Sequence, residues 1–140
     1  MNNVFNPSTF EVDWSYRTIL VVEDIEANYK FMEMALQKTK ARIVHASTGT
    51  EAINMCAADN NIDLVLMDVH LPGISGYDAA REIKKMNSSI TVIAQTAFVF
   101  SGERQKAFYV GCDEYIAKPV CSDELIFTIK NCLLDRGKKA

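Results

Sequence analysis

Several signatures of common protein classes are missing from this chain of 140 residues. None of its four cysteines forms a C-x-x-C pair, and with only two histidines the spacing of a usual zinc site is absent. The segment 1–16 has neither a basic residue nor a continuous apolar core, which argues against a signal peptide. The longest apolar stretch, 90–100, is broken by polar residues and too short to span a bilayer. We therefore expect a cytoplasmic chain with four buried or half-buried thiols.

An excess of positive charge is also missing. The chain has 15 Lys and Arg against 18 Asp and Glu, a formal net charge of −3. Binding to nucleic acids and attraction to anionic membranes both depend on basic residues, so we expect no direct nucleic-acid binding and no membrane insertion. The length suits one domain. We expect a tail or linker over 1–16, ending where Trp14 docks on a domain over 17–136, and a C-terminal tail over 137–140.

From Arg17 onward, short apolar runs alternate with segments of helical periodicity. The predicted strands are 18–22, 41–46, 62–67, 90–94 and 114–117. Three of them are apolar at consecutive positions, which is typical of parallel strands buried on both faces. Helices are predicted between and after them, with a capping box at Thr48-x-x-Glu51, a cap at Ser122, and a fourth helix over about 101–110. Five alternations predict an α/β fold with a doubly wound parallel sheet.

Chemically active side chains stand at the ends of the predicted strands. Ligands of open α/β sheets bind outside the carboxyl ends of the strands, so these side chains are expected at one rim. They are Glu23, Asp24, Asp68, Thr96 and Lys118. Three crowded acids would repel one another, and a hard cation such as Mg²⁺, which takes oxygen ligands, relieves that repulsion. A lysine and a hydroxyl beside them suit phosphoryl chemistry.

Each of these residues also has a structural explanation when taken alone. Asp24 could be the N-cap of the first helix, Asp68 a turn residue before Pro72, and Thr96 a helix cap. Lys118 could be a solvated surface lysine. Their joint order at one rim makes a shared site the better interpretation.

The motifs that contain these residues resemble the receiver domain of two-component signalling over about 17–136. The motifs are Ile-Leu-Val-Val-Glu23-Asp24, Asp-Leu-Val-Leu-Met-Asp68-Val-His-Leu-Pro72-Gly-Ile-Ser-Gly76, Ile-Ala-Gln-Thr96-Ala97 and Gly111-Cys-Asp-Glu-Tyr115-Ile-Ala-Lys118-Pro119. The resemblance implies the flavodoxin-like (βα)5 fold, with a five-stranded parallel sheet in the order 2-1-3-4-5.

The resemblance also implies a role for each site residue. Asp68 resembles the phospho-accepting aspartate, and Lys118 the lysine that pairs with the phosphoryl group. Asp24 resembles a direct Mg²⁺ ligand, Glu23 a companion acid that acts through water, and the backbone carbonyl of His70 a further ligand. The family more often has two aspartates in place of Glu23-Asp24.

Two further residues resemble the switch of the family, and two flank the site. Thr96 resembles the switch hydroxyl and Tyr115 the switch aromatic, and the Lys118–Pro119 bond is usually cis in the family. We expect the imidazole of His70 to face solvent and His45 to pack in mid-strand. His70 and Phe98 flank the site and are expected to exclude water, giving a phosphorylated form that is not unusually short-lived.

The implied function is to take a phosphoryl group from the phosphohistidine of a sensor histidine kinase or a histidine phosphotransfer domain onto Asp68. The domain promotes its own aspartyl phosphorylation and dephosphorylation without being a turnover enzyme by itself. The surface formed by 101–110, 114–117 and the last helix then changes, and it is the expected contact in a dimer. The motifs look most like a receiver fused to the C-terminus of a hybrid sensor histidine kinase, and a stand-alone response regulator is the alternative.

Rival functions use a similar sheet. An aspartate-based Mg²⁺-dependent phosphatase normally needs a second acid two residues after its nucleophile, where this chain has His70. A flavin binder needs a Ser, Thr and Gly phosphate loop after the first strand, where Glu23 and Asp24 would repel a phosphate. A degenerate receiver that serves only as an interaction module would not be expected to keep all the site residues.

Overall fold

The computed structural model describes residues 12–97, 102–118 and 121–139, which alternate strands with helices throughout. The elements are β1 Thr18–Val22, α1 Glu26–Gln37, β2 Arg42–Ala46, α2 Gly49–Ala58, β3 Ile62–Asp68, α3 Gly76–Met86, β4 Thr91–Thr96, α4 Glu103–Tyr109, β5 Glu114–Ala117 and α5 Ser122–Lys139. The Phe98 side chain and the Lys118–Pro119 bond, which carry two of the sequence predictions, lie outside the described residues.

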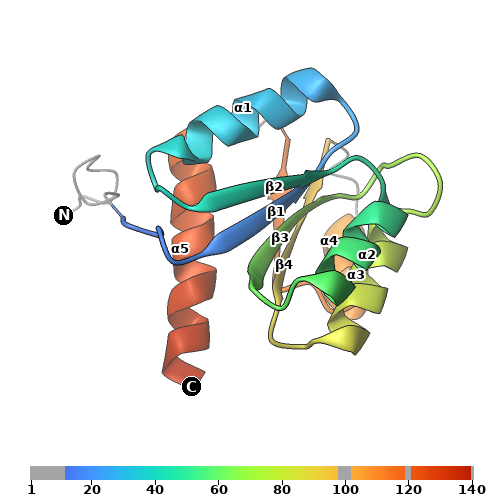
Figure 1. Cartoon of the computed structure of the whole chain (residues 1–140). Coiled ribbons are helices and arrows are strands. Elements are labelled where there is room, and N and C mark those ends of the chain that lie inside the picture. Colours follow the sequence, from blue (N-terminus) through green and yellow to red (C-terminus); the bar gives the residue numbers. More distant parts are fainter. Residues whose placement is uncertain (1–11, 98–101, 119–120, 140) are drawn as a thin grey trace.

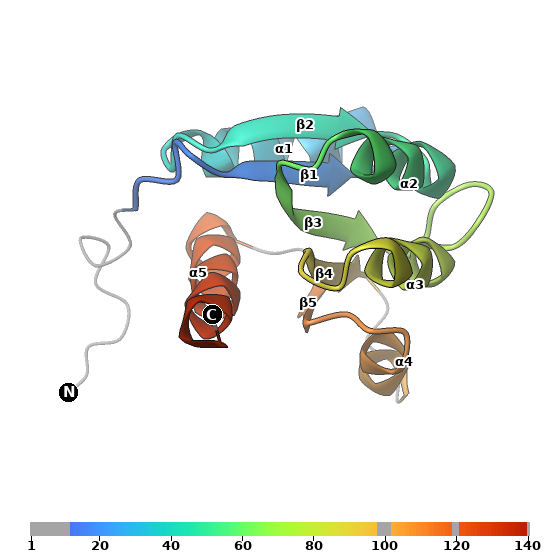
Figure 2. The ribbon, with the colours of Figure 1, turned by 60° about the horizontal axis from the view of Figure 1, so that its bottom comes forward.

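The sheet has five parallel strands in the order β2-β1-β3-β4-β5, which confirms the predicted fold. Every residue of β1 and β4 is buried, as the continuous apolar runs predicted. Helices α1 and α5 cover one face, and α2, α3 and α4 cover the other (Figures 1 and 2). The order reverses beside β1, and such a switch point is where open α/β sheets bind their ligands.

Two apolar clusters hold these three layers together. The cluster under α1 and α5 includes Trp14, which is only 6% exposed and donates its backbone N–H to Thr39 O at 2.7 Å. Trp14 therefore docks on the domain, as the sequence predicted. The cluster on the other face gathers small residues of α2 and α3 against the strands, among them Ala52, Ala79 and Ala80. Small side chains let these helices pack closely on the sheet, and each helix begins at the rim because it follows the carboxyl end of a parallel strand.

Local signals explain most of the helix starts. Thr48 Oγ1 accepts the N–H of Glu51 at 3.1 Å, which confirms the predicted cap of α2. Ser75 does the same for α3, and its Oγ accepts the N–H of Asp78 at 3.1 Å. The predicted cap at Ser122 is wrong, because α5 already includes that residue.

The structure also bears on the expected burial of the cysteines and on membrane-spanning helices. Cys56 and Cys112 are buried and Cys132 is intermediate, but Cys121 is exposed, so the expectation of four buried or half-buried thiols is wrong for Cys121. The reason is position, since Cys121 stands just before α5 at the rim of the sheet. Within the described ranges, no helix is long and apolar enough to cross a membrane.

Candidate functional site at the carboxyl ends of the strands

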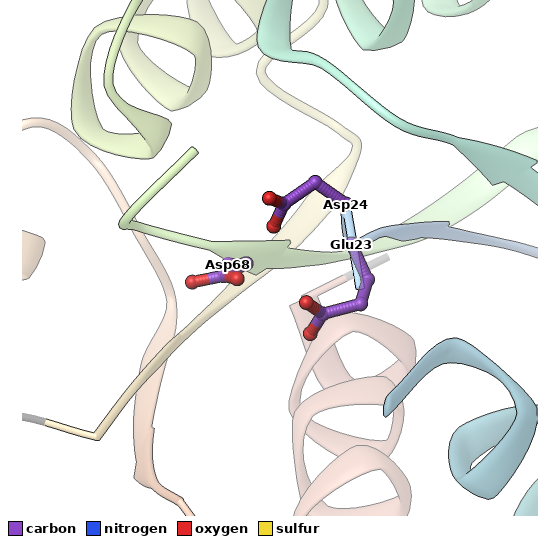
Figure 3. A group of neighbouring side chains, drawn as sticks. All are labelled: Glu23, Asp24 and Asp68. Atoms are coloured by element: carbon purple, nitrogen blue, oxygen red, sulfur yellow. The ribbon is translucent and has the colours of Figure 1, made fainter. Parts of the chain in front are cut away.

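The carboxylates of Glu23, Asp24 and Asp68 meet at the ends of β1 and β3 (Figure 3). One carboxylate oxygen from each lies within 4.8 Å of the others. β1 and β3 pair in parallel register, from Ile19 opposite Leu64 to Val22 opposite Met67, so the residues after them come together. The sequence prediction that these acids share one rim is thus confirmed by the geometry. We call Glu23, Asp24, Asp68 and Lys118 the acidic rim.

Lys118 joins two of these acids. Its Nζ lies 2.8 Å from Glu23 Oε1 and 3.2 Å from Asp68 Oδ2. Burial lowers the pKa of Lys118, but the hydrogen bond to Glu23 and the charge of Asp68 outweigh that effect, so the pKa is raised above its usual value. Lys118 is therefore a fixed cation at neutral pH, and the idea of a merely solvated lysine does not fit.

The two adjacent acids differ in their surroundings. Glu23 is completely buried, with its Oε1 on Lys118 and its Oε2 accepting the N–H of Ile25 at 3.3 Å. Asp24 is exposed, and no described residue donates a hydrogen bond to its carboxylate. The alternative that Asp24 caps α1 is wrong, because Ile25 occupies the N-cap position. Asp24 is thus the acid whose carboxylate is best placed to bind a cation.

Asp68 is held by the turn that follows β3. Its Oδ1 accepts the N–H of His70 at 3.0 Å. The turn presses against the start of α3, where a Cβ added to Gly76 would lie only 2.2 Å from Asp68 O. A glycine is therefore required at this position for the backbone to approach Asp68 so closely. This requirement accounts for Gly76, the last residue of the Pro72-Gly-Ile-Ser-Gly76 run.

Thr96 lies at the end of β4 on the other side of Asp68. It is completely buried, and its Oγ1 is 3.1 Å from Nε2 of His70. The exposed position of His70 agrees with the sequence prediction, but its ring also bonds the Thr96 hydroxyl, which the sequence did not indicate. The alternative that Thr96 caps α4 is wrong, because that helix has Gly102 at its N-cap position.

Tyr115 belongs to β5 and is half-buried against the cluster under α2, α3 and α4. Burial and then the nearby charge of Glu103 raise the pKa of Tyr115. Glu103 also accepts a hydrogen bond of 2.6 Å from the hydroxyl of Tyr77 on α3. The residues from Glu103 to Ala117 form what we call the α4–β5 edge.

Known proteins share both the sequence pattern and the fold. The family model of the response regulator receiver domain matches residues 19–130. The chain belongs to this receiver family. Receiver domains serve two-component signalling, take phosphoryl groups from histidine kinases or phosphotransfer proteins, and bind Mg²⁺ in an acidic pocket.

Individual relatives support the assignment to the receiver family. The polar-differentiation response regulator DivK of Brucella ovis is 33% identical over 121 residues, covering 85% of this chain and 98% of DivK. A receiver domain protein from Clostridium thermocellum has a TM-score of 0.82 and 29% identity, covering 89% of this chain and 99% of that one. The BeF3-activated DrrB receiver domain has a TM-score of 0.75 and 29% identity, covering 87% of this chain and 98% of that one.

Proposed function

We propose that this receiver accepts a phosphoryl group on Asp68 with the help of Mg²⁺ and Lys118. The observation that carries the proposal is the placement of the Asp68 carboxylate. It lies 3.2 Å from the Lys118 ammonium, inside a group of three carboxylates. A nucleophilic oxygen beside a fixed cation and a metal site is what phosphoryl transfer requires, because catalysis there depends on positioning and charge.

The chemistry of the acidic rim suits Mg²⁺. Glu23, Asp24 and Asp68 offer hard oxygen donors within 4.8 Å of one another, and Asp24 has no partner among the described residues. Asp24 and Asp68 would bind the ion directly, Glu23 through water because Lys118 already engages it, and His70 through its backbone carbonyl. When bound, the ion neutralises charge on the transferring phosphoryl oxygens.

The transfer itself makes one bond and breaks one. A carboxylate oxygen of Asp68 attacks the phosphorus of a phosphohistidine on a kinase or phosphotransfer partner. The P–N bond breaks, and its electron pair stays on the histidine nitrogen. Lys118 then pairs with a phosphoryl oxygen and offsets the new charge of about −1.5 to −2.

The phosphorylated state would be read out at the α4–β5 edge. Thr96 leaves His70 and donates its hydroxyl to a phosphoryl oxygen, and Tyr115 turns into the space that Thr96 vacates. Both side chains stand on neighbouring strands, with Thr96 opposite Ala117 in register. The face of α4, β5 and α5 thus changes through a local charge event, and it is the surface we propose for partners or a dimer.

A labelling experiment tests the proposal. The protein is incubated with Mg²⁺ and acetyl phosphate, or with beryllofluoride, and modification of residue 68 is followed by mass spectrometry or NMR. We expect wild type to be labelled and Asp68→Asn to lose labelling, with Asp78→Asn on the exposed side of α3 as the matched control. Equal labelling of Asp68→Asn would disprove the assignment.

Further measurements distinguish the phosphatase alternative and test the proposed phosphodonor. Repeated turnover of a phosphate ester would favour the phosphatase, although the position two residues after Asp68 carries an imidazole rather than an acid. Faster phosphorylation from an isolated phosphotransfer domain of the same genome than from acetyl phosphate would support the two-component partner. Origin in a hybrid sensor histidine kinase and a domain spanning 17–136 stay proposals that rest on the sequence motifs.

A further inference from the structure

His45 makes a contact with the acidic rim that the proposed function does not use. It lies on β2, in register with Val21 of β1, and its ring nitrogen Nε2 is 2.9 Å from the backbone oxygen of Glu23. A carbonyl oxygen can only accept a hydrogen bond, so Nε2 must carry the proton and donate it. The contact therefore sets the tautomer of the imidazole.

The ring of His45 is also held from the helix side. It stacks on the ring of Tyr29 in α1, with centroids 3.8 Å apart and planes inclined by 12°. The hydroxyl of Tyr29 donates to Glu33 Oε2 at 3.2 Å, one turn further along the same helix. The imidazole is thus fixed by a stacked face and by a hydrogen bond, and it can impose its own position on the Glu23 carbonyl.

The backbone held by His45 leads directly to Asp24. On the other side, the N–H of Glu23 donates to Ala46 O at 3.0 Å, which ends the pairing of β1 and β2. The Glu23 carbonyl belongs to the peptide bond shared with Asp24, so the hydrogen bond from His45 sets the plane of that peptide. Asp24 itself is exposed and has no partner among the described residues, which leaves its backbone as the means of aiming its carboxylate.

We propose that His45 is a positioning residue for the cation site, holding the Glu23–Asp24 peptide so that the Asp24 carboxylate faces Asp68 before the ion arrives. The inference rests on the proposed Mg²⁺ site. Preorganised ligands bind a metal more tightly because less order has to be imposed on binding. The competing explanation is a purely structural one, in which His45 only fastens β2 to α1.

Two substitutions separate these explanations. His45→Phe keeps an aromatic ring to stack on Tyr29 but removes the donor to the Glu23 carbonyl. His45→Gln places an amide N–H close to the position of Nε2 and restores the donor. Ile43→Val, on the same strand and half-buried, is the matched control for a loss of strand stability that does not touch Glu23.

The measurement is the Mg²⁺ dissociation constant, from the amide NMR shifts of the β1–α1 and β3–α3 turns, alongside unfolding in urea. We expect about tenfold weaker Mg²⁺ binding in His45→Phe, the lower end of the range for groups that orient metal ligands. His45→Gln should stay within about twofold of wild type, and so should Ile43→Val.

The outcomes distinguish this inference from the proposed function. Unchanged Mg²⁺ affinity in His45→Phe would overturn the positioning role, as would a loss in His45→Gln as large as that in His45→Phe. An affinity loss in Ile43→Val that matches the loss in His45→Phe would show that strand stability alone is responsible. A wild-type protein that binds no Mg²⁺ at all would overturn the proposed function itself.

Discussion

Glu23 and Glu103 each start a region of functional interest, and the structure holds them in different ways. Glu23 has a partner on each of four atoms: Ala46 on its N–H, His45 on its carbonyl, and Lys118 and Ile25 on its carboxylate. Glu103 opens α4, a helix of seven residues with no side-chain cap. Among the described residues, the hydroxyl of Tyr77 is the side-chain group that holds it, through its carboxylate and its backbone oxygen.

The acidic rim around Glu23 is thus held in place before any reaction, whereas the α4–β5 edge that begins at Glu103 is free to rearrange. The acidic rim needs its charges in place before a phosphoryl group arrives, because electrostatic stabilisation works without reorganisation. Within α4, Ala107 is the one buried residue. The ion pair that joins α4 to β5, between Arg104 and Glu114, spans 3.8 Å at the surface. Elements with few buried contacts open at low free-energy cost, which suits a surface that must change.

The largest effect on phosphorylation is expected at the acidic rim, from Lys118→Met. Removal of the ammonium leaves the buried Glu23 without its cation and Asp68 without a partner for the phosphoryl charge. We expect phosphorylation by acetyl phosphate to fall by about 100-fold or more, as for other groups that stabilise developing charge. The initial rate of Asp68 labelling measures this change. Lys30→Met, in an exposed ion pair on α1, should label like wild type, and an equal loss there would contradict the role of Lys118.

The second effect concerns the boundary between the two regions, where His70 bonds Thr96. If the ring of His70 excludes water from the acyl phosphate, His70→Ala should shorten its lifetime about three- to tenfold, since closed sites protect reactive intermediates. His70→Phe keeps the bulk and should preserve the lifetime. The decay of phosphorylated protein after removal of donor measures both. Equal decay of all three proteins, or decay of wild type within seconds, would contradict the shielding role.

A smaller effect is expected from Tyr77→Phe, which removes the hydrogen bond of 2.6 Å to Glu103 but keeps the ring under Lys106. A hydrogen bond to a charged group contributes about 1.5–3 kcal/mol, so α4 should open more often. Amide hydrogen exchange should therefore accelerate in α4 while the amides of β1 and β3 keep their protection. Equal acceleration in all of these elements would show that the edge does not open independently.

The smallest effect uses buried thiols as reporters of local opening. Burial, with the charge of Asp59, raises the pKa of Cys56 to about 11, and burial, with Asp113, raises that of Cys112 to about 12. A raised pKa leaves little reactive thiolate on either residue at pH 8, so both thiols should react slowly unless their surroundings open.

We expect opening of the α4–β5 edge to expose Cys112 more often than Cys56 is exposed. Cys112 lies within that edge, two residues before β5, and local opening restores an ordinary pKa to its thiol. In a background with Cys121→Ser and Cys132→Ser, labelling by a thiol reagent at pH 8 should therefore reach Cys112 at least as fast as Cys56. Slower labelling of Cys112 than of Cys56 would indicate that the edge opens no more readily than α2.

The sequence alone was enough to predict the alternation of elements, the parallel sheet and the group of residues at its rim. These features depend on short-range patterns: consecutive apolar residues for doubly buried strands, and polar residues directly after them. Because parallel strands all end on the same side, Glu23, Asp24, Asp68, Thr96 and Lys118 had to meet there. The sequence predictions were wrong for the burial of Cys121 and for the cap of α5, because each depends on the placement of a single residue.

Only the tertiary structure decided how these residues are held. The contacts from His45 to Glu23, His70 to Thr96 and Tyr77 to Glu103 join residues 22, 26 and 26 positions apart. Such contacts depend on strand register, helix packing and side-chain rotamers together, and no local pattern encodes them. For the same reason no local pattern showed that Glu23 and Asp24 differ in burial. The fold buries the first against Lys118 and leaves the second exposed, because successive side chains at the end of a strand point in different directions.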